Sequence, residues 1–428
     1  MRPSLRLLLV LALLLPLAGL AATPVIEISG ANFRPMPIAS ASPLAQDDGA
    51  RARAAEVDEA LNFDLAGCGL FQVLDRKSFL SDAKEGVTAG SINFSNWANV
   101  GADALVKTQL STVGDRLRGD LRLFTVSTGK EELKVSHEAS SKDARRLAHF
   151  LANAVYKFFT KETGPFETHL VMGRKTAQGK DIIMTDWDGR EPVGIAVGGL
   201  NVLPALGPDG TVAYTSYRKG KPDLYAQRPG GQATVLVQAG QMATGVAYSS
   251  DGRRIAYSLA DGGGAQIWVA AADGSGAKQL TSTPYFINSS PTWSPDNRRI
   301  AFVSTRGGTP QIYLMGADGG EPKRLTFKGN YNQTPDWSPR GDLIAFTARD
   351  ERNAFDLFTV NVETGSVNRL TQDVGNNEEP SFSPNGRLIV FTSTRNGWSQ
   401  PFVMTFEGNN QTALPIEKGT YSTPDWGP

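Results

Sequence analysis

The chain has 428 residues, 40% of them hydrophobic and 20% charged, which is the composition of a globular protein with a sizeable core. Its 43 basic residues balance 43 acidic ones, so no net charge draws the whole chain to nucleic acid or to an anionic membrane. The single cysteine, Cys68, excludes an intramolecular disulfide and any metal site built from several cysteines.

Residues 1–21 are typical of a signal peptide. Two arginines precede an apolar run over residues 7–15, and a small-x-small triplet follows at residues 19–21. The run is shorter than the roughly 20 residues that cross a bilayer, which argues against a membrane anchor. We expect cleavage after Ala21 or Ala22 and, since no disulfide can form, export to the bacterial periplasm.

The mature chain begins with an alternation of apolar and polar side chains. This pattern predicts either an ordinary edge strand or a detachable strand that pairs with a partner's sheet edge, and the sequence leaves both open. The segment consists of Pro24, Val25, Ile26, Glu27 and Ile28.

Residues 22–163 predict a small α/β domain. Apolar residues between positions 147 and 159 recur at helical spacing, and another helix is expected over about residues 50–66. A Thr-Gly-Pro triplet at residues 163–165 marks the boundary with the rest of the chain. Strands are expected at residues 71–74, 104–110, 121–126 and 132–135.

Residues 164–428 contain an internal repeat. The spacing of its copies, 42 to 45 residues, matches the length of a four-stranded propeller blade. Trp293, Trp337, Phe382 and Trp426 recur once per copy, so we expect them to fill the wedges between blades. The repeated motif resembles Pro-x-Trp-Ser-Pro-Asp-Gly, with equivalent positions at residues 208, 250, 295, 339, 384 and 428.

A second series of six apolar strands, between residues 181 and 403, is out of phase with the first series. One blade must therefore be composite. The ring closes if residues 423–428 supply the inner strand of the blade that begins near Thr168. The predicted fold class is an α/β N-terminal domain plus an all-β six-bladed β-propeller closed by the C-terminal strand.

Catalytic motifs are missing from the sequence. No Gly-x-Ser-x-Gly motif occurs, and His137, His149 and His169 fall in separate predicted elements. This spacing predicts neither a catalytic triad nor a metal cluster. We therefore expect no enzyme activity, no cofactor and no metal site.

Four acidic residues near the starts of the inner strands leave one alternative open. Asp336, Glu378, Glu379 and Asp425 could hold calcium weakly in the central channel of the propeller. They could equally be solvated side chains on loops.

The segments that precede the inner strands form the remaining candidate site. They are rich in Asn, Gln, Ser and Tyr, and propeller geometry brings them to one mouth of the channel. This composition suits an adaptable hydrogen-bonding surface, although turns also favour Asn and Ser. The candidate residues are Met242, Thr244, Gly245, Asn288, Ser289, Asn332, Gln333, Asn377, Glu378, Tyr421 and Ser422.

The signal peptide, the front domain and the repeated Pro-x-Trp-Ser-Pro units together resemble the TolB family of the bacterial Tol-Pal system over essentially the whole chain. The stretch 181–189 that opens the propeller and the Pro-Asp-Trp-Gly-Pro that closes it are the most specific features. The resemblance implies a soluble periplasmic adaptor, peripheral to membranes only through its partners. Its role would be outer-membrane integrity and constriction during cell division.

The resemblance also links the two candidate surfaces to partners. It implies that the mouth residues bind the lipoprotein Pal, that residues 24–28 bind TolA, and that other Tol-Pal components join them. Ser289 matches a hydroxyl-bearing position of the family, and Gly245 falls where a small residue is usual.

Overall fold

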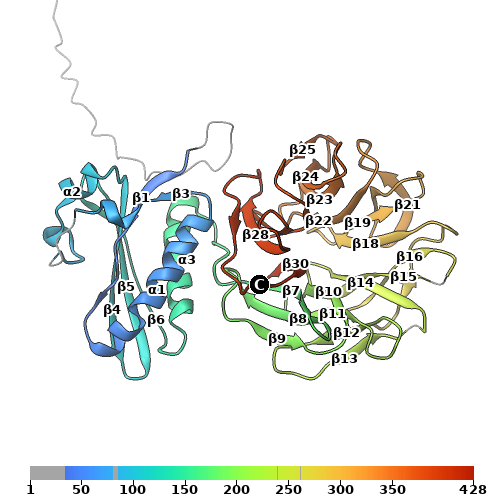
Figure 1. Cartoon of the computed structure of the whole chain (residues 1–428), viewed down its shortest axis with the longest axis horizontal. Helices are drawn as coiled ribbons and strands as arrows, with labels where there is room; N and C mark the ends of the chain where they lie inside the picture. Colours follow the sequence, from blue (N-terminus) through green and yellow to red (C-terminus); the bar gives the residue numbers. More distant parts are fainter. Residues whose placement is uncertain (1–33, 81–84, 239, 261) are drawn as a thin grey trace, which may run out of the picture.

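The computed structural model describes residues 34–80, 85–238, 240–260 and 262–428. In this part of the chain, an amino-terminal domain lies beside a ring of β-sheets (Figure 1). The predicted signal peptide and residues 24–28 lie outside the described residues.

The amino-terminal domain is a mixed sheet covered by helices. The sheet order is β3-β1-β4-β5-β6, with β2 beside β4; β1 is parallel to β3 and β4, whereas β4, β5 and β6 are antiparallel. The elements are β1 (Met36–Ser40), β2 (Leu44–Ala45), α1 (Asp48–Gly67), β3 (Phe71–Val73), two short 3-10 turns at Arg76–Ser78 and Ala89–Ser91, α2 (Phe94–Asn99), β4 (Ala104–Val113), β5 (Arg116–Thr125), β6 (Lys130–Ser140) and α3 (Ala144–Thr160).

Helices α1 and α3 pack on each other and on one face of this sheet. Asp47 and Asp143 cap their first turns by accepting backbone hydrogen bonds. Successive residues of β4 point to opposite faces, so Val106 packs in the core formed with both helices, whereas Leu105 packs with Trp97 of α2. The sheet is therefore covered on both faces next to α2, whereas Arg118, Asp120 and Arg122 of β5 leave the rest of the second face partly exposed.

The remaining chain forms six four-stranded antiparallel sheets, the blades of a propeller, which confirms the predicted fold class. The inner strands are β30 (Tyr421–Gly427), β10 (Asn201–Leu206), β14 (Met242–Tyr248), β18 (Asn288–Trp293), β22 (Asn332–Trp337) and β26 (Asn377–Phe382). The second strands are β7 (His169–Thr176), β11 (Val212–Ser216), β15 (Arg254–Ala260), β19 (Arg299–Ser304), β23 (Leu343–Arg349) and β27 (Leu388–Ser393). The third strands are β8 (Gly179–Asp186), β12 (Asp223–Gln227), β16 (Ala265–Ala271), β20 (Gln311–Gly316), β24 (Phe355–Asn361) and β28 (Gln400–Thr405). The outer strands are β9 (Val193–Ala196), β13 (Thr234–Val237), β17 (Lys278–Gln279), β21 (Gly319–Arg324), β25 (Val367–Arg369) and β29 (Thr412–Ala413).

The blade β30-β7-β8-β9 is composite, because its inner strand comes from the end of the chain. Strand β30 is antiparallel to β7, with Trp426 opposite Leu170. Trp426 is 6% exposed, and its ring stacks on Trp187 with the ring centroids 6.0 Å apart. The predicted closure of the ring is confirmed, with β30 beginning at Tyr421, ahead of the predicted Thr423.

Inner-strand side chains hold neighbouring blades together. Trp293, Trp337 and Phe382 are buried in the seams, as their recurrence predicts. In four seams, an inner-strand side chain also accepts a hydrogen bond from a backbone N–H of the next blade. Alanine occupies the equivalent position in the other two seams, at Ala205 and Ala247. The four bonds join Trp337 N to Thr292 (3.3 Å), Phe382 N to Asp336 (2.7 Å), Trp426 N to Ser381 (3.1 Å) and Leu206 N to Asp425 (2.6 Å).

Candidate protein-binding site

The predicted site is the mouth of the channel at which the inner strands begin. The hairpins at the other end of the inner strands face the amino-terminal domain, where Glu162, just after α3, pairs with Arg340 and Arg387. The mouth therefore lies on the side of the propeller away from that domain.

Each inner strand carries a β-bulge at this mouth. The bulge residue has a positive φ, between 48° and 64°, and in five of the six strands it is not glycine. A left-handed backbone costs a non-glycine residue about 1 kcal/mol, so these positions persist only because the surrounding blades determine them. The bulge ring consists of Leu203, Gly245, Ser290, Thr334, Glu379 and Thr423. The residues just before it form the mouth ring, namely Val202, Thr244, Ser289, Gln333, Glu378 and Ser422.

The mouth ring is half-buried in every blade and contains five of the predicted site residues. Gly245, another predicted residue, lies in the bulge ring. A Cβ at Gly245 would meet nothing within 4 Å, so there is space for a side chain at this position. Glycine is favoured there by the backbone conformation, because its φ is 64°. Val202 is missing from the prediction, although aligning the repeats would have identified it.

Four predicted residues lie beneath the mouth ring. Asn288, Asn332, Asn377 and Tyr421 are at most 2% exposed, so they do not face a partner directly. The asparagines instead join adjacent blades, because each amide donates to the side chain at the start of the third strand of the preceding blade. The bonds run from Asn288 to Gln266 (3.1 Å), from Asn332 to Gln311 (2.8 Å) and from Asn377 to Asp356 (3.1 Å).

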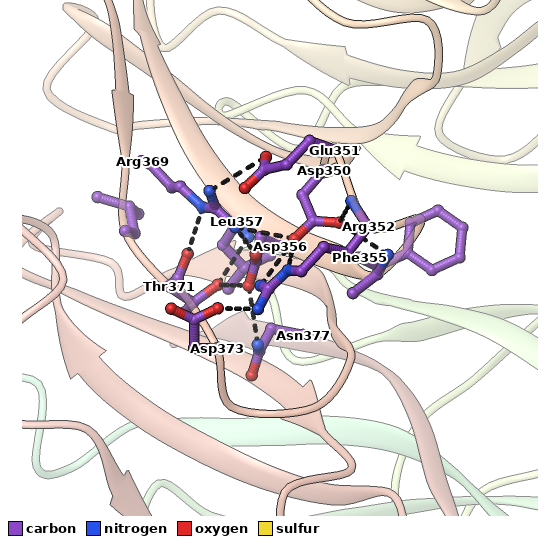
Figure 2. Close-up of polar contacts among 12 residues, drawn as sticks. Asp350, Glu351, Arg352, Phe355, Asp356, Leu357, Arg369, Thr371, Asp373 and Asn377 are labelled. Carbon is purple, nitrogen blue, oxygen red and sulfur yellow. Dashed lines mark hydrogen bonds and ion pairs between the residues drawn. The ribbon is translucent and has the colours of Figure 1, made fainter.

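Figure 2 shows this buttress between β24 and β26. Asp356 accepts hydrogen bonds from Asn377 and from the Thr371 hydroxyl (2.7 Å), while Arg369 pairs with its other oxygen at 2.5 Å. Arg369 also reaches Asp350 at 3.1 Å. Every polar group of Asp356 is thus satisfied inside the fold, which indicates a structural role.

Exposed apolar side chains surround part of the mouth. They lie at or just before the starts of β10, β14, β18 and β22, and are 38% to 87% exposed. Such a concentration on one face is typical of a protein-binding surface. Only Met242 was predicted, because exposure depends on the packing of the blades and not on residue type. This apolar collar consists of Val197, Leu200, Met242, Tyr285, Phe286, Ile287 and Phe327.

A cavity of about 440 Å³ follows the channel between the inner strands. Burial, together with the Asp425 carboxylate, raises the pKa of Asp336 to about 8, and burial also raises the pKa of Asp425. Burial and Glu379 raise the pKa of Glu378 to about 6. Asp336 is therefore mainly protonated at neutral pH, which lowers the charge available to a cation. Weak calcium binding in the channel stays a prediction.

Two of the three histidines lie beside the same carboxylate, because His169 Nε2 is 3.8 Å and His149 Nε2 is 3.9 Å from Asp186. His137 stacks on Phe150, with ring centroids 3.7 Å apart. His149 of α3 is buried at the junction of the two domains, beside Asp186 and Asp188. Spacing in the sequence did not predict this grouping.

Residues 156–428 match the family model of the TolB beta propeller domain, and residues 24–132 match the TolB amino-terminal domain. The chain belongs to the TolB family. Among the described residues, no helix has the length and the apolar character needed to cross a membrane.

Relatives extend over nearly the whole chain. The Tol-Pal system protein TolB of Myxococcus xanthus is 63% identical over 423 residues, covering 99% of this chain and 98% of that protein. The protein of the same name in Anaeromyxobacter dehalogenans is 45% identical over 408 residues, covering 95% and 94%. The crystal structure of TolB from Acinetobacter baumannii superposes with a TM-score of 0.79 at 23% identity, covering 92% of this chain and 97% of that one, which supports the fold alone.

Proposed function

We propose that the chain is a non-enzymatic periplasmic adaptor of the Tol-Pal system that binds Pal at the channel mouth and TolA through residues 24–28. Its role would be outer-membrane integrity and constriction during division. The apolar collar around the polar mouth ring is the observation that carries the proposal. Full-length relatives named Tol-Pal system protein TolB support the assignment to this system.

The mouth has the anatomy of a protein interface. Exposed aromatic and aliphatic groups of the collar, such as Tyr285 at 87% and Phe327 at 72% exposure, gain free energy when a partner covers them. The half-buried hydroxyl and amide groups of Ser289 and Gln333 offer directional hydrogen bonds at the centre. Bulges held by the blades fix this surface before binding, which lowers the entropy lost on association. Binding of this kind needs no catalytic step and no cofactor.

The Pal arm is tested by calorimetric titration of the mature chain with the lipid-free Pal domain. Ser289→Arg places a long cation in the centre of the mouth ring and should weaken binding by more than about tenfold, since a misplaced charge at an interface costs several kcal/mol. Ser250→Arg is the matched control, because exposed Ser250 lies in the hairpin at the opposite end of the channel. Equal affinity in both variants would move the site elsewhere, and a wild-type chain that does not bind Pal would refute the proposal.

The proposed binding to TolA is tested by deleting residues 22–33, the segment that contains residues 24–28. The deleted protein should lose TolA binding and keep its thermal unfolding profile and its binding to Pal. Persistent TolA binding by the deleted protein would contradict the role of this segment. A peptidase assay on the purified chain addresses the enzymatic alternative, and turnover of substrate would contradict the adaptor role.

A further inference from the structure

A buried polar cluster joins the amino-terminal domain to the composite blade. Asp64 comes from α1, His149 from α3, and Asp186 and Asp188 from the end of β8 and the turn after it. Asp64 and Asp188 are fully buried and His149 is 2% exposed, whereas the Asp186 side chain keeps 25% of its surface. The cluster takes no part in the mouth.

Asp64 fixes the orientation of the His149 ring through its Nδ1 atom. Its Nδ1 lies 2.8 Å from Asp64 Oδ2, and the other oxygen of Asp64 accepts a hydrogen bond from Trp187 Nε1 at 2.8 Å. A carboxylate that holds one imidazole nitrogen in this way fixes the ring and its tautomer, with the proton on Nδ1. The lone pair of Nε2 is then aimed at whatever lies in front of the ring.

Two carboxylates lie in front of the ring. Nε2 of His149 is 3.9 Å from Asp186 Oδ2 and 3.9 Å from Asp188 Oδ2, and this buried nitrogen has no hydrogen-bond partner. A nitrogen lone pair that faces two carboxylate oxygens is unfavourable unless a cation lies between them. Buried polar atoms are nearly always satisfied, so this nitrogen requires a cation in front of it, either its own proton or a metal ion.

The net charge of the cluster is opposite to that of a divalent cation. Asp64, Asp186 and Asp188 contribute three negative charges, and Arg145, which pairs with Asp188, contributes one positive charge. Although burial opposes it, the carboxylates of Asp64, Asp188 and Asp186 raise the pKa of His149 to about 9, so the ring carries a second proton when no ion is bound. A metal ion would replace that proton, and two negative charges would then remain around it. A divalent cation would compensate both of them.

We propose that His149 Nε2, Asp186 and Asp188 bind a divalent metal ion of the zinc class that ties the two domains together. One imidazole nitrogen and two carboxylate oxygens form a donor set that zinc accepts, and the half-buried Asp186 leaves a side open for water and for entry of the ion. The three donor atoms lie within 4.8 Å of one another. Two ligands of a tetrahedral zinc ion lie roughly 3.4 Å apart, so side-chain movements of up to roughly 1.4 Å would complete the site.

The residues around the donors fit this role. Asp64 supplies the carboxylate that commonly supports a zinc-bound histidine. Arg145 pairs with Asp188 Oδ2, the same oxygen that faces His149, so this oxygen would be shared between the guanidinium and the ion. Because the donors belong to both domains, the bound ion would resist separation of the amino-terminal domain from the propeller. This inference is independent of Pal and TolA binding.

The test uses the full mature chain after treatment with a chelator. Titration with zinc chloride, followed by calorimetry and by metal analysis after dialysis, should show one ion per chain and a higher unfolding temperature with zinc. His149→Gln and Asp186→Asn should each weaken binding at least about tenfold and abolish the temperature shift. His137→Gln is the matched control, since that histidine stacks on Phe150 outside the cluster, and it should bind like the wild type.

A proton on His149 Nε2 is the competing occupant. If the wild-type chain binds no zinc, or if Asp186→Asn binds zinc as tightly as His137→Gln, the proposal is overturned and the cluster is an interdomain salt bridge. His149→Gln could fail to fold because it breaks the contact with Asp64. Asp186→Asn then decides, because its partly exposed side chain tolerates the change.

Discussion

Replacing Asp336 with asparagine should make the chain more stable at and above neutral pH while leaving its stability in acid unchanged. Asp336 lies on β22 beside the channel, where burial and Asp425 raise the pKa of its carboxyl group from 3.8 to about 8. One of its oxygens accepts the backbone hydrogen bond from Phe382, at 2.7 Å. An asparagine amide oxygen can accept the same bond, so the substitution removes the ionisation and keeps the contact.

The sign follows from the raised pKa. Below pH ~4 the carboxyl group is protonated in the folded and unfolded chains and contributes nothing. Between pH ~4 and ~8 the unfolded chain releases the proton while the folded chain keeps it, so wild-type stability falls as pH rises. One unit of pKa corresponds to ~1.4 kcal/mol, and the full shift would cost ~4 kcal/mol at pH ~7. Channel water screens the partly exposed side chain, so we expect Asp336→Asn to gain ~2 kcal/mol there.

Urea unfolding followed by tryptophan fluorescence, repeated across this pH range, measures the difference. Asp209→Asn is the control of opposite sign, because hydrogen bonds from Thr211 and the charge of Arg228 lower the pKa of that carboxyl group in spite of its partial desolvation. It should lose stability at neutral pH and approach the wild type in acid. Parallel pH profiles for the wild type and Asp336→Asn would refute the assignment of the raised pKa to Asp336.

Two further substitutions test how the ring and the domains are fastened. Trp426→Ala should cost about 3–5 kcal/mol of unfolding free energy, because it empties a buried wedge between blades and removes the hydrogen bond to Thr168. Deleting residues 423–428 should prevent closure of the ring. A near-native unfolding temperature for either variant would contradict this view. Glu162→Gln should cost about 1 kcal/mol at neutral pH by weakening its pairs with Arg340 and Arg387. Because Arg387 lowers the pKa of Glu162, this deficit should vanish as the pH falls, and an unchanged deficit in acid would count against the ion pairs.

The architecture was predictable because it repeats. A motif that recurs every 42 to 45 residues indicates one propeller blade per copy. This motif is out of phase with the second series of apolar strands, so one blade must be composite, and β30 closes it. The same register would also have identified Val202 as a member of the mouth ring. Repetition works here because each blade solves the same packing problem with residues in equivalent positions.

Repetition also explains where the prediction of the mouth was too broad. An asparagine that recurs at the start of an inner strand can face a partner or the neighbouring blade, and both uses give the same sequence pattern. Asn288, Asn332 and Asn377 are buttresses, because the third strand of the preceding blade brings Gln266, Gln311 and Asp356 within hydrogen-bonding distance. The sequence does not predict that the apolar collar is exposed either, because a residue of the type of Tyr285 or Phe327 can also be buried between blades, as Trp293 is.

The cluster at the domain junction could not be predicted from the repeat. Asp64 and His149 come from the helices α1 and α3, and Asp186 and Asp188 come from the end of β8 and the turn after it. Only β8 belongs to the repeat, so no period relates the four residues. They meet because Trp187 inserts between α1 and the stacked ring of Trp426, which places the acidic residues on either side of it against α3. The strand that closes the propeller therefore also positions the donors of the proposed metal site, and loss of Trp426 should disturb both.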